Sequence, residues 1–294
     1  MSHLSRREFL KSSGIAVLAG TVGRLSLMLP SAPQIDALYG RALSVLTVYD
    51  SPSPSAVVIN RLFPDSVVPI IDTLSDWYQL ANGYAKRSDI QPMMLTNHTV
   101  PTPQLPFWAE VGGAVAIVRG WCAADAPLVA RIGHGGVAQV VDMLPGEQHT
   151  WYALADEDTF LGWSSASAWI PVEAAPFEMD SVQLHIDTVN RTLQLLENHQ
   201  PMMRAPIMLG RGLAAGNYAV HRHKRSVKYS LDDASKGYGV PWRIDFGEYS
   251  LAGAYWHNDF GTDKILPGPD VQVAPAVARW LYERLPENSL IVVR

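Results

Sequence analysis

The sequence predicts an all-β fold in which several small domains follow one another. Between residues 38 and 270 no segment has the periodicity of a long amphipathic helix, whereas short β-rich runs alternate with turn residues. The chain of 294 residues has 22 glycines and 21 prolines, which imply frequent turns and suit many short strands. Apolar residues recur at helical spacing only near the end, so we expect one C-terminal helix.

The composition indicates a globular chain and excludes few functions. Apolar residues make up 48% and charged residues 17%, and 294 residues are enough for two or three domains. The net charge of -5 does not favour nucleic acid as a partner. Cys122 is the one cysteine, so neither an internal disulfide nor a cysteine-based metal site is possible. We expect Cys122 to be a small buried apolar residue, and we expect no cofactor.

The N-terminus predicts export. Residues 5–11 read Ser-Arg-Arg-Glu-Phe-Leu-Lys, a twin-arginine pattern, and the apolar stretch 14–29 that follows is interrupted by Arg24. Such a stretch is too short and too interrupted to span a bilayer well. We therefore expect residues 1–34 to be a signal for the Tat pathway and the remaining chain to be extracytoplasmic, in the cell envelope. Ala32 ends a poor cleavage site, so cleavage and retention as an anchor both remain open.

Residues 38–95 predict a first small barrel. Strands are expected at 42–49, 56–62, 67–71 and 76–80, with turn residues between them. The loop 51–55, the run Val-Ile-Asn-Arg-Leu at 58–62, Trp-Tyr-Gln-Leu at 77–80 and Gly-Tyr-Ala at 83–85 follow in an order that resembles bacterial SH3-like domains.

Residues 107–172 repeat this pattern after a proline-containing linker at 95–106. The expected strands include 114–118, 126–132 and 135–141, and the element Trp-Tyr-Ala-Leu at 151–154 repeats the earlier Trp-Tyr-Gln-Leu. Two such elements in matching positions indicate an internal repeat and a second SH3-like domain. Trp77 and Trp151 are expected in the barrel cores; the alternative is a stacking platform for sugars or stem peptides.

Residues 181–294 predict a third β-domain that ends in a helix and a strand. Apolar residues alternate with polar ones on both sides of a turn at 187–191, which indicates a β-hairpin. Pro275 stands at a first-turn position of the late helix, and Trp280, Leu281 and Leu285 are expected in its core. Residues 290–293 indicate a buried terminal strand.

Motifs along this third domain resemble the catalytic domain of the L,D-transpeptidases, the YkuD family. The matching strings are Met-Leu-Gly-Arg at 208–211, Pro-Trp-Arg-Ile-Asp-Phe at 241–246, Leu-Ala-Gly-Ala-Tyr-Trp-His-Asn-Asp-Phe-Gly at 251–261 and Ala-Arg-Trp-Leu-Tyr at 278–282. The resemblance implies a β-sandwich with residues 253–256 on a strand that lines the groove. It also implies peptidoglycan stem peptide or glycan as the partner.

The residues that carry the family's chemistry are missing. The resemblance implies a cysteine thiolate that attacks a stem-peptide carbonyl, is assisted by histidines, and is acylated by carbapenems. Ala252 occupies the upstream histidine position. The spacing of the family's motif, counted forward from Gly261, places the cysteine position at Gly268. Counted back from Trp280, the same spacing places the cysteine position at Asp270 and a histidine position at Gly268. Neither cysteine nor histidine occurs in residues 262–294.

The groove candidates that remain are Gly253, Tyr255, Trp256 and His257. His257 does not align with the family's base; a structural histidine is the favoured interpretation and a groove residue the alternative. His221 and His223 share a strand face, where a solvated basic edge is favoured over a metal site.

Two acidic residues of the signature loop are the remaining candidates to replace the missing chemistry. Asp263 and Asp270 are expected to be solvated, the alternative being a pair for acid–base work.

The sequence therefore predicts a degenerate, non-catalytic homologue of the L,D-transpeptidases. We expect it to bind cell-wall peptide or glycan, or to assist other cell-wall proteins. One rival is an active acyltransferase with a rewired nucleophile. The other is a structural envelope protein that binds another protein through its SH3-like domains.

Overall fold

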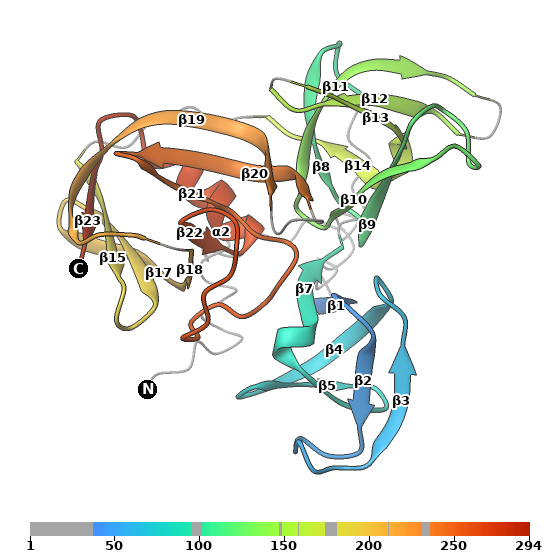
Figure 1. Ribbon diagram of the computed structural model, residues 1–294, viewed down its shortest axis with the longest axis horizontal. Coiled ribbons are helices and arrows are strands. Elements are labelled where there is room, and N and C mark those ends of the chain that lie inside the picture. The colour runs from blue at the N-terminus through green and yellow to red at the C-terminus, as the bar shows by residue number, and fades with distance from the viewer. Residues whose placement is uncertain are drawn as a thin grey trace, which may run out of the picture. The chain divides into compact units, whose positions relative to one another are not determined.

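The computed structural model describes residues 38–95, 102–146, 149–157, 159–173, 181–210, 212–230 and 236–294. The all-β class is confirmed: these residues form three multi-stranded sheets, and α2 (Pro275–Tyr282) is the α-helix among them (Figure 1). The expected signal segment 1–34 and linker residues 96–101 lie outside the described residues. Within the described ranges, no helix has the length and apolar character needed to cross a membrane.

The first sheet belongs to residues 38–95, which we call the first module. Its strands are β1 (Leu38–Ala42), β2 (Leu46–Tyr49), β3 (Val58–Leu62), β4 (Val67–Leu74), β5 (Trp77–Leu80), β6 (Gly83–Lys86) and β7 (Ile90–Met94), with the short 3-10 helix η1 (Arg87–Asp89) before β7. They pair in the order β3-β2-β6-β5-β4-β1-β7. Alternate residues such as Leu46 and Val48 point into one apolar core, which is the period of a half-buried strand.

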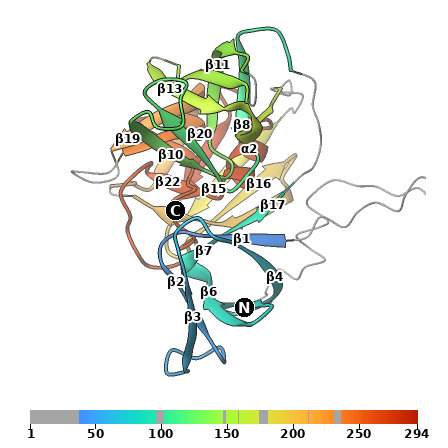
Figure 2. The same ribbon diagram turned by 90° about the vertical axis from the view of Figure 1, so that its right-hand side faces the viewer.

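The second sheet belongs to residues 102–173, which we call the second module. Its elements are β8 (Phe107–Val111), β9 (Val115–Arg119), β10 (Leu128–Gly133), β11 (Val137–Leu144), β12 (Trp151–Ala155), β13 (Phe160–Ser165), η2 (Ala166–Ala168) and β14 (Trp169–Pro171). The order β10-β9-β13-β12-β11-β8-β14 matches the first sheet strand for strand. Figure 2 shows the two modules from a second direction. The SH3-like assignment of both modules stays a prediction.

The third sheet belongs to residues 181–294, the third module. Its strands are β15 (Val182–Asp187), β16 (Thr192–Glu197), β17 (Gln200–Pro206), β18 (Met208–Leu209), β19 (Gly216–Ser230), β20 (Lys236–Phe246), β21 (Tyr249–Gly253), β22 (Val271–Val273) and β23 (Leu290–Val293). They pair in the order β17-β16-β15-β23-β19-β20-β21-β22-β18, so the long β19 joins the two halves. The expected hairpin is confirmed, since β15 pairs antiparallel with β16.

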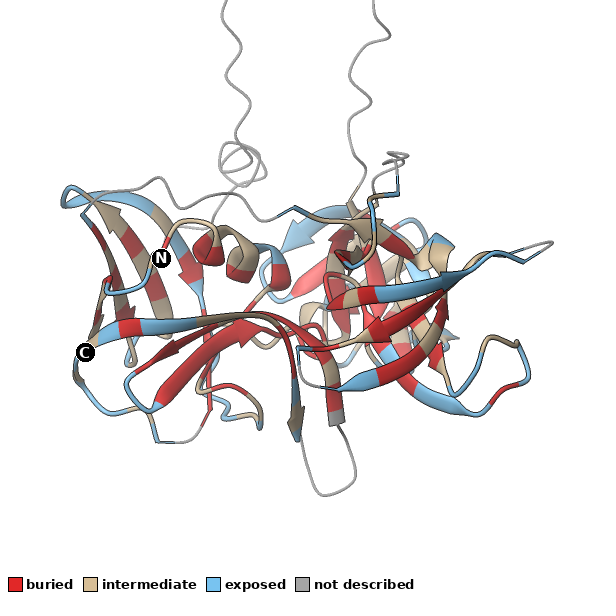
Figure 3. Ribbon diagram, turned by 90° about the horizontal axis from the view of Figure 1, so that it is seen from above, coloured by how far each residue is buried: buried red, intermediate tan, exposed pale blue. Residues whose placement is uncertain are grey.

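The helix and the terminal strand of the third module also follow the expectation. The helix α2 begins at Pro275 and packs against β20 and β21, and Leu281 and Leu285 are fully buried. Figure 3 shows how buried and exposed residues are distributed over the ribbon. Trp280 is only partly buried: it packs against the edge of the core, and the Arg284 guanidinium lies 4.5 Å from the centroid of its ring. The prediction that Trp280 is a core residue was therefore wrong.

The strand expected at residues 253–256 ends earlier. Gly253 is the last residue of β21, and Ala254 donates a backbone hydrogen bond to Val273 O at 2.8 Å as the chain leaves the sheet. Tyr255 then turns into the core of the second module, where it is 5% exposed. The prediction fails beyond Gly253, because a contact with another module determines the path of the chain.

The two tryptophans of the repeated element differ in burial. Trp77 is 8% exposed and packs edge-on against Tyr49, with ring centroids 5.3 Å apart, so it is a core residue as expected. Trp151 is half-buried on β12.

Candidate functional site

The three positions that the sequence resemblance aligns with catalytic residues lie in or next to one parallel ladder of the third module. β21 and β22 pair in parallel with Ala252 opposite Gln272. Asp270 directly precedes β22, and Gly268 stands two residues earlier. Ala252 thus lies within the ladder, whereas Gly268 and Asp270 lie in the loop that leads into it.

Ala252 presents only a methyl group at the centre of this region. It is fully buried in a small cluster with Val227 and Val240, and Tyr229 and Trp256 pack against the cluster while staying partly exposed. A methyl group can neither accept nor donate a proton. No acid–base chemistry is therefore available at this position.

Asp270 is held by the strand beside it. Its Oδ2 accepts hydrogen bonds from Ser250 N at 2.8 Å and from Ser250 Oγ at 3.2 Å. Ser250 Oγ in turn accepts a hydrogen bond from the Tyr229 hydroxyl at 3.0 Å. Burial raises the pKa of Tyr229 to about 12, so its hydroxyl stays protonated and donates. The carboxylate therefore fixes the start of β22 to β21.

A cation lies beside this hydrogen-bonded chain. The Arg243 guanidinium lies 5.3 Å from the centroid of the Tyr229 ring, within the range of a cation–π contact. Arg243 Nε also pairs with Asp245 Oδ1 at 2.5 Å, and the Arg243 side chain remains 29% exposed. The region thus combines two partly exposed aromatic rings with one partly exposed positive charge.

The backbone conformation of Gly268 disfavours a side chain. Its φ is +133°, a conformation that residues with a Cβ rarely adopt. A Cβ at this position would lie 3.1 Å from Trp256 Cζ2 and 3.3 Å from the Gln272 side chain. A histidine at this position would therefore strain the backbone and crowd Trp256 and Gln272.

His257 is a structural histidine in this fold. It is 6% exposed, and its Nε2 donates to Gln272 Oε1 at 2.9 Å, the tautomer that the surrounding hydrogen bonds assign. Its Nδ1 accepts from Asp259 N at 3.3 Å. Burial lowers the pKa of His257, which favours the neutral ring. Because both nitrogens are engaged inside the fold, this ring is not a free base.

The other groove candidates are mostly covered. Gly253 is buried, and a Cβ there would lie 2.8 Å from Pro241 Cγ. The Tyr255 hydroxyl donates to Tyr238 O at 2.5 Å, and burial raises the Tyr255 pKa. Of the four candidates, Trp256 alone keeps a partly exposed side chain. Tyr229, which also lies beside Ala252, was not predicted, because only the pairing of β19 with β20 and the packing on Ala252 bring it there.

The remaining candidates are separated from this region. His223 Nε2 bonds to Leu285 O at 2.9 Å, whereas His221 is exposed. Asp263 is exposed on the loop, and Cys122 is a half-buried free thiol in the second module. Among the residues that the structure describes, no three histidine, cysteine or acidic side chains are grouped to hold a metal ion.

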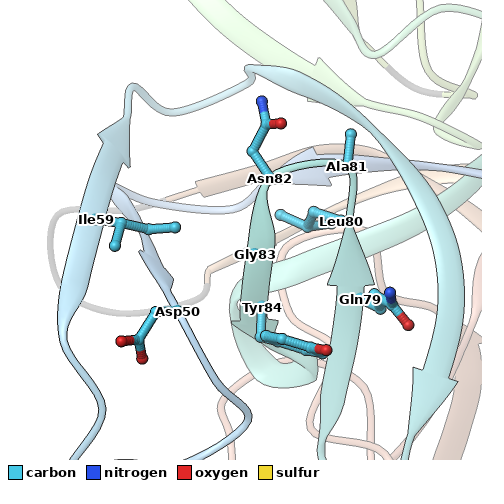
Figure 4. A pocket seen from close by; sticks show the side chains of 8 residues that line it. All are labelled: Asp50, Ile59, Gln79, Leu80, Ala81, Asn82, Gly83 and Tyr84. Carbon is cyan, nitrogen blue, oxygen red and sulfur yellow. The ribbon is translucent and has the colours of Figure 1, made fainter.

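A hollow lies in the first module, at the turn between β5 and β6. It has a volume of about 270 Å³ and is lined by residues that Figure 4 labels: Asp50, Ile59, Gln79, Leu80, Ala81, Asn82, Gly83 and Tyr84. The sequence pattern of the Gly-Tyr-Ala element at 83–85 indicates a strand but does not indicate a hollow there.

Comparisons with known proteins found similarity only to solved structures. No protein-family model and no curated protein matches the chain. The fused Zn-dependent amidase/peptidase/peptidoglycan-binding protein of Clostridium acetobutylicum is 11% identical, with 39% of this chain and 52% of that chain covered and a TM-score of 0.30. The L,D-transpeptidase (Yku) of Stackebrandtia nassauensis is 14% identical, with coverage of 41% and 58% and a TM-score of 0.30.

A third solved structure is covered over its whole length. The L,D-transpeptidase of Mycobacterium smegmatis is 12% identical, with 66% of this chain and 100% of that chain covered and a TM-score of 0.35. The solved structures similar to this chain thus include L,D-transpeptidases, at low identity and low TM-score. The chemistry of the site is therefore argued from its own residues.

Proposed function

We propose that this chain is a non-catalytic, L,D-transpeptidase-like protein of the cell envelope that binds peptidoglycan at the Ala252 region of its third module. The observation that carries the proposal is the Asp270–Ser250 pair. Where the sequence resemblance places a nucleophile, a carboxylate is held by two hydrogen bonds from Ser250. The buried methyl group of Ala252 lies two residues further along the same strand, β21.

Acyl transfer requires a nucleophile that a base activates and a substrate can reach. Ser250 is the one hydroxyl beside Asp270 that a rewired mechanism would use, since its Oγ donates to the carboxylate. Its 4% exposure keeps a substrate carbonyl away from Oγ. His257 lacks a free nitrogen, as its hydrogen bonds to Gln272 and Asp259 N engage both. These contacts favour binding without catalysis over the rewired enzyme.

The partly exposed side chains supply a binding surface of suitable chemistry. The rings of Tyr229 and Trp256 can stack on a sugar or a peptide plane, and the Arg243 guanidinium can attract a carboxylate. Peptidoglycan offers sugars, peptides and carboxylates together. We extend the proposal to export through the twin-arginine pattern at residues 5–11, which would bring the chain to this ligand.

Co-sedimentation with purified sacculi tests the proposal. The full chain should sediment with sacculi, and Trp256→Leu should weaken binding by roughly tenfold, because one stacking ring is lost. Trp280→Leu is the matched control, since Trp280 is another partly buried tryptophan of the same module, lying on α2. Equal loss in both variants, or no sedimentation of the wild type, would contradict the proposal. Capture of a protein in place of sacculi would favour the structural envelope rival.

A further inference from the structure

The segment 255–258, which carries Trp256 and His257, is held at both ends by the first module. Arg41 Nη2 donates a hydrogen bond of 2.5 Å to Tyr255 O. At the other end, the Asn258 side-chain amide donates to Ile90 O at 2.8 Å and to Arg87 O at 3.0 Å. The residues flanking the partly exposed Trp256 ring are therefore fixed from outside the module to which the ring belongs.

Arg41 is built into this contact. It is 7% exposed, its Nε donates to Gln91 Oε1 at 2.8 Å, and its Nη1 pairs with Asp65 Oδ1 at 2.7 Å. Asp65 Oδ2 pairs in addition with Arg131 of the second module. A guanidinium whose three nitrogens all donate inside the protein has little freedom to move. The carbonyl of Tyr255 is thus held by a rigid donor.

In the second module, a glycine, Gly133, lies against this contact. A Cβ at Gly133 would lie 2.5 Å from Arg41 Nη2 and 2.7 Å from Tyr255 Cδ2. The absence of a side chain at Gly133 is what allows Arg41 to reach Tyr255. One glycine therefore controls whether the first module can hold the segment.

We propose that the first module is a clamp on segment 255–258, with Arg41 and Asn258 as positioning residues that keep Trp256 in place beside Ala252. The clamp depends on the proposed function only for the identity of the ligand, because Arg41 and Asn258 make their contacts without any ligand. Released from these contacts, the segment would exchange two anchoring interactions for water, and Trp256 would lose its fixed orientation. Ligand binding at the third module would then depend on how the first module docks.

Hydrogen exchange of the full chain, measured without ligand, tests the clamp. Gly133→Ala should speed exchange of the amides at 255–259 by roughly tenfold to a hundredfold, the effect of losing a charge-assisted hydrogen bond. Asn258→Ala should act on the same amides from the other end. Exchange in the β15–β16 hairpin should stay unchanged in both variants, which separates a local release from general loss of stability. Gly113→Ala is the matched control, because a Cβ there meets nothing within 4 Å.

Both variants should also bind sacculi more weakly than the Gly113→Ala control does. Unchanged exchange at 255–259 in both variants would overturn the clamp, as would faster exchange with unchanged sacculus binding. Asn258→Ala decides the matter if Gly133→Ala does not fold. If the wild type fails to bind sacculi, the proposed function falls, while the exchange data still decide whether the clamp exists.

Discussion

Arg41 and Glu110 occupy equivalent positions in the first two modules. Arg41 lies opposite Val67 in the β1·β4 ladder, and Glu110 lies opposite Val137 in the β8·β11 ladder. Each is largely buried and contacts the third module: Arg41 donates to Tyr255 O, and Glu110 Oε2 pairs with Arg279 Nη1 at 3.1 Å. The same strand position thus contacts the third module in both repeats, through a basic residue in the first module and an acidic residue in the second.

Glu110 should make the stability of the chain depend on pH. Desolvation raises its pKa to about 7, above the ordinary value of 4.5, despite the opposing effect of Arg279. The folded state therefore holds this proton up to higher pH than the unfolded state. The resulting stability is fully present below about pH 4.5 and is lost as pH rises through about 7, by at most ~3 kcal/mol.

Urea unfolding from about pH 5 to pH 8 measures this effect. The difference in unfolding free energy between wild type and Glu110→Gln should change across that range, because the glutamine does not titrate. A constant difference at all pH values would show that Glu110 titrates with its ordinary pKa.

Asp270 should matter for stability. Asp270→Ala leaves the buried Ser250 N and Oγ without their acceptor, which should lower the free energy of unfolding by about 1–3 kcal/mol. Asp263→Ala, on the exposed part of the same loop, should change it by less than about 0.5 kcal/mol. Equal effects in chemical denaturation would argue that the Asp270–Ser250 contact contributes little.

Restoring the family's residues should fail for steric reasons. In the triple variant Ala252→His, Gly268→His, Asp270→Cys, an imidazole must enter the fully buried Val227–Val240 cluster, at a cost of about 1–3 kcal/mol. Any side chain at Gly268 adds strain of about 1–3 kcal/mol at φ +133°. We expect a lower Tm and no turnover of a tetrapeptide donor. A stable triple variant with transpeptidase activity would show that the site can still accept the chemistry.

Export should depend on the arginine pair. The Tat pathway reads twin arginines, so replacing Arg6 and Arg7 with lysine should retain a reporter fusion in the cytoplasm. Fractionation of cells that carry the fusion measures this. Undiminished export of the lysine variant would contradict a Tat route.

The elements that were predicted correctly from the sequence are those that a local residue pattern determines. Strand alternation located the β15–β16 hairpin, and helical spacing after Pro275 located α2 with Leu281 in its core. The roles that the resemblance gives to Ala252 and Asp270 stay predictions. Tyr255 behaved differently, because its burial depends on the second module, and Trp280 is covered by a charged neighbour. Such contacts leave no periodic signal in the chain.

The third module should lack an activated nucleophile, and intact-mass spectrometry after incubation with the carbapenem imipenem measures this. The Cys122→Ala variant is the protein to use, because the half-buried free thiol of the second module can react slowly on its own account. Asp270 would give at most a labile anhydride, and Ser250 is buried. We expect an unchanged mass, whereas a covalent adduct that maps within residues 181–294 would show that the module still carries a reactive nucleophile.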